Sequence, residues 1–207
     1  AKYVYAAHTC FSADGSKFIK NWRSGLYVYD FDRCTGQLSN PIHLPYDSTY
    51  LGGGVVTSPN SRFLYLFNFN YIWQYDFWAT DFEGSRQTVA VYDGFASPFP
   101  TRFYQPMVAP NGKIYSISTS TNNILHVIHH PDEPGLACGV EPHGVILPAL
   151  TNYIIPNMTN YRLGALAGSP CDSLTVSSAE PTPHRYEPAG LDVYPNPATE
   201  EVNFEQL

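Results

Sequence analysis

Residues 58–77 read SPNSRFLYLFNFNYIWQYDF, and this stretch decides the fold. It opens with a Ser-Pro-Asn-Ser turn, in which proline presets φ at the second position and asparagine tolerates the positive φ of a tight hairpin. Two runs rich in aromatic residues follow, at residues 62–67 and 71–77. Aromatic and β-branched residues fit the pleated surface of a sheet, so both runs are predicted to be strands.

The first of these runs is apolar on both of its alternating sets of side chains. Phe63, Tyr65 and Phe67 form one set, and Leu64 and Leu66 form the other. A sheet with one face in water would alternate apolar and polar residues instead. The sequence therefore predicts a sheet packed between two others, as in a propeller, where neighbouring blades cover both faces.

The same pattern recurs along the chain, which indicates an internal repeat. Turns of the same kind carry Asp14, Asn60 and Asn111, which are separated by 46 and 51 residues. The Tyr-Asp-Phe at residues 75–77 also occurs at 29–31, again 46 residues apart. Two independent markers thus share one period, of the length expected for a propeller blade.

Each unit contains four candidate strands, one before the turn and three after it. The expected strands are residues 9–12, 17–20, 26–31 and 41–44 in the first unit, 55–58, 62–67, 71–77 and 88–92 in the second, and 107–109, 113–117, 124–129 and 144–147 in the third. No long stretch has the apolar spacing of an amphipathic helix. We therefore expect an all-β fold of β-propeller-like, four-stranded blades.

Three units are fewer than the roughly four to eight blades that typically close a propeller. We therefore expect the chain to be the C-terminal part of a larger propeller. In the alternative, residues 1–5, 48–54 and 151–174 complete or cap a smaller assembly.

Composition narrows the class of protein. The 207 residues are 43% hydrophobic and 15% aromatic but only 14% charged, which is typical of a folded domain. The net charge of -7 and the scattered Lys and Arg residues argue against nucleic-acid binding, which needs clustered cations. No apolar run approaches the roughly 18 residues of a transmembrane helix. The first residues lack the layout of a signal peptide, so we expect a mature chain or a fragment.

The cysteines point to an oxidising compartment. Cys10, Cys34, Cys138 and Cys171 match no zinc-binding spacing. An even number of cysteines in an aromatic, lysine-poor chain favours disulfide formation. Four cysteines allow three pairings, and the sequence leaves the choice open.

The chain changes character after residue 174. Residues 175–190 (TVSSAEPTPHRYEPAG) are rich in proline and poor in apolar residues, which is typical of a linker. Residues 191–207 resume a strand, a proline-bounded turn and a strand, but they are too few to bury a core. We therefore divide the chain into blades at 1–174, a linker at 175–190 and a C-terminal segment at 191–207.

The C-terminal segment resembles the opening of the type A sorting domain of Bacteroidetes type IX secretion substrates, which is a small β-sandwich. The resemblance implies export through the periplasm and across the outer membrane by the type IX translocon. Only the first hairpin of such a sandwich is present, so we expect the chain to be truncated within the sorting domain. The residues that match the sorting motif are Val193, Tyr194, Pro195, Asn196, Pro197, Ala198 and Thr199.

The body of the chain resembles secreted, propeller-like Bacteroidetes proteins. The matching motifs lie at residues 26–36 (LYVYDFDRCTG), 109–115 (APNGKIY), 125–128 (LHVI) and 155–164 (IPNMTNYRLG). The resemblance spans most of residues 10–174 and departs at Met158 and Thr159, where an aromatic residue or proline is typical. These motifs are structural, so the resemblance implies a fold and export but no chemistry.

Two groups of polar residues resemble candidate sites. On a strand, Asp30 and Asp32 would share a face, as paired carboxylates for calcium or for acid-base chemistry do, but a turn in which aspartate accepts nearby amides is the favoured interpretation. Residues 129–133 (HHPDE) offer four metal ligands, yet adjacent strand residues point to opposite faces, so no metal is expected.

The remaining histidines and glycines have structural interpretations. His8, His43 and His143 have no partner spacing and are expected to be hydrogen-bonded structural residues. Residues 52–54 are three glycines without the lysine and helix of a phosphate-binding loop, so we expect a loop that leads into a blade. No Gly-x-Ser-x-Gly or comparable nucleophile motif occurs.

The three tryptophans admit two interpretations. Trp22, Trp73 and Trp78 could stack on sugar rings, or they could pack in the core, which is the favoured interpretation. Trp22, beside a predicted hairpin tip, is the best candidate for exposure.

The leading hypothesis is a secreted or cell-surface, non-catalytic binding or adhesion module with an extracellular protein or glycan as its ligand. No cofactor, metal or catalytic residue is expected. The rival hypothesis is a propeller-fold extracellular hydrolase or lyase acting on polysaccharide. Such an enzyme would gather its site from several blades and leave no local motif, so the sequence leaves both hypotheses open.

Overall fold

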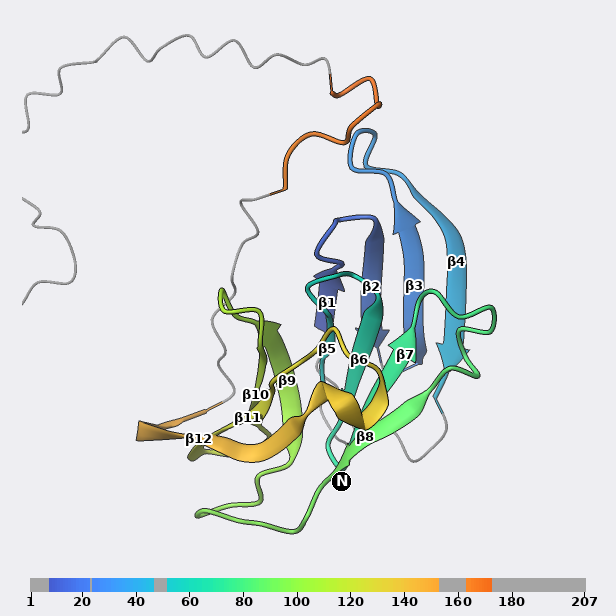
Figure 1. Cartoon of the computed structure of the whole chain (residues 1–207). Helices are drawn as coiled ribbons and strands as arrows, with labels where there is room; N and C mark the ends of the chain where they lie inside the picture. Colours follow the sequence, from blue (N-terminus) through green and yellow to red (C-terminus); the bar gives the residue numbers. More distant parts are fainter. Residues whose placement is uncertain (1–7, 23, 47–51, 153–162, 173–207) are drawn as a thin grey trace, which may run out of the picture.

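The structure, a computed structural model, describes residues 8–22, 24–46, 52–152 and 163–172. In this part of the chain the strands form three four-stranded antiparallel sheets, in each of which consecutive strands are neighbours. The single helical element there is a short 3-10 turn, η1 (Gly135–Cys138). These features confirm the predicted all-β fold with four strands per unit (Figure 1).

The strand bounds follow the predicted ones closely. The first sheet consists of β1 (His8–Phe11), β2 (Lys17–Trp22), β3 (Gly25–Phe31) and β4 (Leu38–Pro45). The second consists of β5 (Val55–Thr57), β6 (Phe63–Asn68), β7 (Tyr71–Asp76) and β8 (Gln87–Val91). The third consists of β9 (Phe103–Val108), β10 (Ile114–Ser118), β11 (Asn122–Ile128) and β12 (Val140–Thr151).

The largest differences from the predicted bounds lie in the third sheet. β9 starts four residues earlier than expected, at Phe103 rather than at residue 107. β12 extends well beyond the predicted residues 144–147 on both sides, and its pairing with β11 shifts register twice. Such bulges break the regular alternation of side chains, so the sequence pattern identified only part of each strand.

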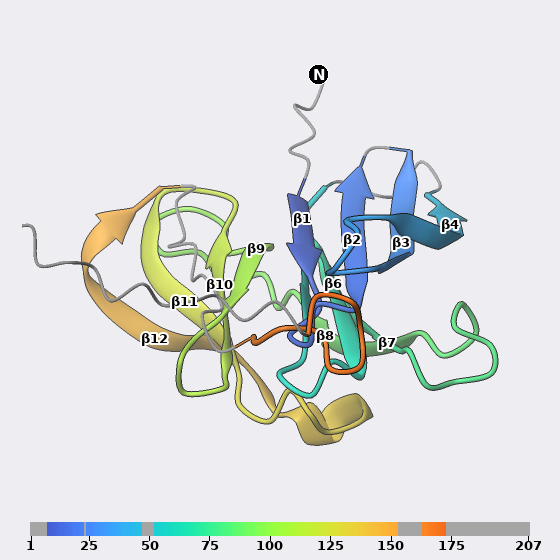
Figure 2. The same cartoon turned by 90° about the horizontal axis from the view of Figure 1, so that it is seen from above.

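The three sheets are arranged like the blades of a propeller. The first strand of the second sheet, β5, lies between the first strands of the other two sheets, β1 and β9. The last strands, β4 and β8, lie on the outside with mostly exposed side chains. Seen from above, the sheets fan out from the inner strands (Figure 2).

Strand β6 is buried on both faces, as the alternation of its residues predicts. Phe63, Tyr65 and Phe67 belong to the core between the second and third sheets. Leu64 and Leu66 belong to the core between the first and second sheets. Full burial of such side chains contributes about 1.5–3 kcal/mol each, so β6 joins the two cores of the molecule.

The predicted turns form, and side-chain hydrogen bonds close them. The Ser12 hydroxyl accepts from the Lys17 amide, and the Ser58 hydroxyl accepts from the Phe63 amide, both at 2.9 Å. In the third turn alanine replaces serine, and Asn111 Oδ1 still accepts from the Lys113 amide at 3.1 Å.

The three glycines at residues 52–54 form the buried loop that leads into β5, as predicted. Gly53 has a φ of +142°, and a Cβ there would lie 1.9 Å from the Phe67 carbonyl oxygen. This close approach of two backbones explains why glycine is required at Gly53.

After the third sheet, the chain returns to the first sheet. Cys171 forms a disulfide with Cys34, 137 residues earlier, with a Cα–Cα distance of 5.5 Å. Nearby, Arg33 Nη1 donates to the Gly164 carbonyl at 2.9 Å. We call residues 163–172 the strap. The disulfide chooses one of the three pairings that the sequence left open, and Cys10 and Cys138 stay unpaired.

Several predicted segments lie outside the described residues. They are the linker at 175–190, the C-terminal segment at 191–207 with its sorting motif, and most of the motif at 155–164. Among the described residues, no helix is long and apolar enough to cross a bilayer.

We expect the double substitution Cys34→Ser/Cys171→Ser to lower the free energy of unfolding by on the order of 4 kcal/mol. The reason is that a cross-link over more than 100 residues lowers the chain entropy of the unfolded state by about that amount. Urea unfolding followed by tryptophan fluorescence measures the change. A reducing agent should destabilise the wild-type protein to the same extent and leave the double variant unchanged. Equal stability of the two proteins would show that the strap contributes nothing.

Candidate functional site

The paired aspartates have structural roles, but only Asp32 accepts nearby amides in a turn as predicted, whereas Asp30 lies on β3. Asp30 forms an ion pair with Lys17 and accepts from Asn40 Nδ2 at 2.7 Å. The hydrogen bond from Lys17 is the main cause of the lowered pKa of Asp30. Asp32 accepts the amides of Cys34 and Thr35 at 2.8 and 3.1 Å, which closes the turn between β3 and β4.

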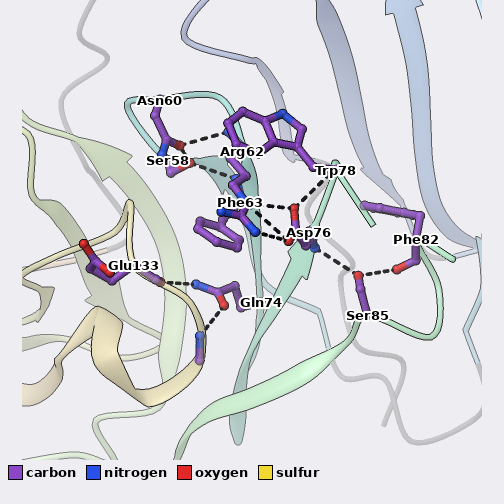
Figure 3. Close-up of polar contacts among 11 residues, drawn as sticks. Ser58, Asn60, Arg62, Phe63, Gln74, Asp76, Trp78, Phe82, Ser85 and Glu133 are labelled. Atoms are coloured by element: carbon purple, nitrogen blue, oxygen red, sulfur yellow. Dashed lines mark hydrogen bonds and ion pairs between the residues drawn. The ribbon is translucent and has the colours of Figure 1, made fainter. Parts of the chain in front are cut away.

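An equivalent ion pair stands in the second sheet (Figure 3). Arg62 Nη2 and Nε donate to the two carboxylate oxygens of Asp76 at 2.8 and 3.1 Å. The Asp76 amide donates to Ser85 Oγ, which donates to the Phe82 carbonyl at 2.6 Å. Because Arg62 hydrogen-bonds to it, the pKa of Asp76 is lowered. These contacts fix the connection between β7 and β8.

In residues 129–133 the candidate ligands diverge. His129 contacts Lys113 Nζ through Nδ1 at 3.0 Å and Glu141 through Nε2 at 2.6 Å. Asp132 instead accepts the Asn60 amide at 2.9 Å, in the neighbouring sheet. Within the part of the chain that the structure describes, no group of three His, Cys, Asp or Glu side chains is placed to hold a metal ion.

A buried glutamine, which the sequence did not single out, joins the second and third sheets. Gln74 Nε2 donates to Tyr65 Oη at 2.7 Å and to the Glu133 carbonyl at 2.8 Å, and its Oε1 accepts the Gly135 amide at 2.7 Å. Tyr65 Oη in turn donates to the Pro131 carbonyl. Figure 3 shows the contact between Gln74 and Glu133. All of these groups are satisfied, so the network anchors the connection between β11 and β12.

The tryptophans differ in exposure. Trp73 is half-buried and stacks on Tyr71, with ring centroids 5.7 Å apart. Trp22 is 39% exposed and lies under Lys20 Nζ. Trp78 is 71% exposed, so it, and not Trp22, is the most exposed of the three. Trp78 lies in the connection that follows β7, beyond the packed part of the sheet.

The connection between β8 and β9 lies at the opposite end of the strands from the connection between β7 and β8. We call residues 93–101 the aromatic loop, because Phe95 and Phe99 in it are 45% and 53% exposed. The Phe95 carbonyl accepts from Tyr92 Oη at 2.6 Å and from Thr101 Oγ1 at 2.9 Å. The Phe95 amide donates to Asp93 Oδ1 at 2.9 Å. These bonds fix the backbone of the loop from both ends.

His143 of β12 holds the aromatic loop from the side. Its Nε2 lies 3.0 Å from Asp93 Oδ2, its Nδ1 lies 3.3 Å from Thr101 Oγ1, and its ring packs on Phe95 at 4.4 Å. His143 has a φ of +60°, which is strained for a residue other than glycine. Its contacts to the loop offset that strain. The expectation of a hydrogen-bonded histidine is confirmed, although its partners lie 42 and 50 residues away.

Beneath His143 lies a second, buried histidine. His126 is 1% exposed, and its ring packs edge-on against Phe103. Its Nδ1 accepts the His143 amide at 3.3 Å, so its proton sits on Nε2 and is donated to Ser118 Oγ at 3.2 Å. Burial lowers the pKa of His126 to about 3, with the nearby His143 as a lesser cause. His126 is therefore neutral at physiological pH.

Neither histidine activates a nucleophile. Asp93, His143 and Thr101 stand in the order of a catalytic triad, but Thr101 is 0% exposed and donates its hydroxyl proton to the Phe95 carbonyl. His126 donates to Ser118, whereas a general base must accept the proton of the nucleophile. The arrangement can position the aromatic loop, and what it presents to solvent is apolar surface.

The buried His126 predicts a loss of stability in mild acid. An unfolded histidine titrates near 6.5, whereas folded His126 stays neutral down to about pH 3. Between these values the unfolded state binds one more proton, so the free energy of unfolding falls by about 1.4 kcal/mol per pH unit as the pH falls. This contribution is complete above pH 6.5, and about 2 kcal/mol of it is lost at pH 5.

Urea unfolding at pH 7 and pH 5 measures this loss. The matched variant is His126→Gln, whose amide can accept from His143 and donate to Ser118 but does not titrate. We expect the variant to lose less stability than the wild type between the two pH values. Burial also lowers the pKa of His8, and this contribution is common to both proteins. An unchanged pH dependence in the variant would contradict the assignment.

Comparison with known proteins finds distant likeness in structure alone. No family model and no curated protein matches the chain. The holo form of the pyranose dehydrogenase PQQ domain from Coprinopsis cinerea is similar, with 12% identity and a TM-score of 0.47 over 61% of this chain and 40% of that one. Kuenenia stuttgartiensis hydrazine synthase follows, with 16% identity and a TM-score of 0.37 over 58% and 31%. The chain thus spans less than half of either protein, and both TM-scores lie below 0.5, so the geometry of the three sheets alone supports the propeller-like fold.

Proposed function

We propose that the chain is a non-catalytic binding or adhesion module that acts outside the cell after export by the type IX machinery. The observation that supports binding is the aromatic loop, which holds Phe95 and Phe99 at the surface on a hydrogen-bonded backbone. Aromatic anchors dominate the energetics of protein interfaces. A loop that is already fixed loses little entropy on binding, so its contacts convert into affinity efficiently.

The proposed module is part of a larger propeller. The repeat supports this, because the face of the second sheet that carries Leu64 and Leu66 packs on the first sheet. Phe18 and Lys20 occupy the equivalent positions of β2 and face away from the second sheet. On this outward face, Phe11 is 51% exposed and contacts the rings of Phe18 and Phe31. We propose that a further blade covers this aromatic face in the complete propeller.

The proposed export rests on the sorting motif at residues 193–199, which lies outside the described residues. The Cys34–Cys171 disulfide supports a location outside the cytoplasm, because disulfides persist in oxidising compartments.

The rival hypothesis, an extracellular hydrolase or lyase acting on polysaccharide, needs reactive groups that a substrate can reach. The polar clusters described above, around His143 and His126, engage their hydroxyl and imidazole groups in the packing of the aromatic loop. They therefore support the binding hypothesis over the catalytic one.

Export is tested by removing residues 191–207, with whatever follows them in the gene, in a host that has the type IX machinery. We expect the deletion variant to accumulate in the periplasm and the wild type to reach the medium or the cell surface, as immunoblots of cell fractions would show. Continued secretion of the variant would contradict the proposal. The intact mass of the secreted wild type, compared with 23.1 kDa, reports in the same experiment whether further blades are present.

Binding is tested with fluorescently labelled protein on intact cells and extracellular matrix of the secreting organism. We expect the double substitution Phe95→Ser/Phe99→Ser to reduce saturable binding at least about tenfold, because two aromatic anchors are removed. Leu136→Ser is the matched control, since Leu136 is an apolar residue that is 78% exposed on the connection between β11 and β12. A double variant that binds like the control would contradict a role for the aromatic loop, and release of sugar products would favour the enzyme.

A further inference from the structure

The three sheets have the same strand order and the same turns, so a feature found in one sheet alone is not required by the fold. At the edge that carries the turns, a cation follows each turn and meets a partner at the end of the third strand: Lys17 with Asp30, Arg62 with Asp76, and Lys113 with His129. These recurrent charged pairs are thus part of the repeated fold. The residue that follows the Tyr-Asp-Phe repeat does not recur in this way.

That residue differs between the first and second sheets. Asp32 follows the repeat in the first sheet, and its carboxylate closes the local turn. Trp78 follows it in the second sheet, where only its backbone amide takes part, donating to Asp76 Oδ1 at 2.9 Å. The indole of Trp78 is 71% exposed. A large exposed indole where the related unit places a turn-forming carboxylate is a feature beyond what the fold needs.

The Trp78 indole is oriented by its neighbours (Figure 3). The guanidinium of Arg62 lies over the indole with its carbon 4.7 Å from the ring centroid, and it lies at the same distance from the Phe63 ring. Arg62 is itself fixed by its two-pronged contact with Asp76. The indole is thus backed on one face by a positioned planar group. Among the described residues, no aromatic ring or cation stacks on its other face.

The charges around the indole define the ligand class. Asp76 neutralises Arg62 and accepts from its Nε and Nη2. The platform, by which we mean the Trp78 indole with the Arg62 guanidinium behind it, therefore has no net positive charge to hold an anion. The net charge of -7 repels acidic polymers. Within the described part of the chain, Nη1 of Arg62 has no acceptor and can donate to a hydroxyl group. An apolar plane with a neutral hydrogen-bonding rim matches the apolar face and hydroxyl edge of a pyranose.

We propose that Trp78 and Arg62 form a subsite for a neutral polysaccharide, in which one pyranose ring stacks on the indole and a hydroxyl accepts from Arg62 Nη1. The platform is open rather than enclosed, which suits a ring within a long chain. The subsite is separate from the aromatic loop, which lies at the opposite edge of the sheets, and it stands whether or not that loop binds a partner.

Affinity electrophoresis of the full chain, in native gels that contain soluble polysaccharide, tests the proposal. The probes are hydroxyethylcellulose and galactomannan as neutral polymers and polygalacturonate as an acidic one. We expect the neutral polymers alone to retard the wild-type protein. Trp78→Ala should raise the dissociation constant at least tenfold, and Trp78→Phe should retain part of the affinity. Trp22→Ala is the matched control, because it removes a 39% exposed indole from another sheet.

Thermal unfolding distinguishes a loss of binding from a loss of folding. Unchanged thermal unfolding of the Trp78 variants, which truncate an exposed side chain, shows that a loss of retardation is a loss of binding. The proposal is overturned if no neutral polymer retards the wild type, if only polygalacturonate does, or if Trp22→Ala weakens binding as much as Trp78→Ala. Because the binding of cells through the aromatic loop is measured with other variants, failure here leaves that proposal intact.

Discussion

The burial of β6 on both faces is the constraint on which the rest of the structure depends. Its aromatic set packs toward the third sheet and its leucines pack toward the first. In the described part of the chain, one core lies between the first and second sheets and the other between the second and third, so the second sheet packs against both of its neighbours. The backbone of Gly53 lies so close to β6 that a Cβ atom at this position would collide with the Phe67 carbonyl oxygen. The close packing around β6 therefore requires glycine there.

The same constraint explains which features the sequence predicted. The two apolar sets of β6 and the spaced turns are local patterns, and from them the number of sheets and the four strands of each unit followed. The role of Asp32 was also local, since its carboxylate accepts the amides two and three residues further along the chain. Short-range chemistry of this kind is readable from one sequence.

The contacts of the candidate site could not be predicted from local sequence patterns. His143 meets Asp93 across 50 residues, and Gln74 meets Glu133 and Gly135 across about 60, because the stacking of sheets brings these segments together. A lone histidine or glutamine in a strand gives no signal of its partner. The exposure of Trp78 was also missed, because the ring follows a strand in which the nearest aromatic residues, Trp73 and Tyr75, are half-buried and buried. Only the folded units show that Asp32 closes a turn whereas the equivalent Trp78 lies exposed.

The strap has a mechanical consequence. Whatever follows residue 172 is joined covalently, through Cys171 and Cys34, to the first sheet rather than only to β12. Tension applied from that end reaches the first sheet through a covalent bond, and the long outer strand of the third sheet does not carry the load alone. An attachment at the C-terminal end therefore pulls on the array across its sheets and does not peel β12 away from β11, so the strap protects the edge strand that an anchored protein would otherwise lose first.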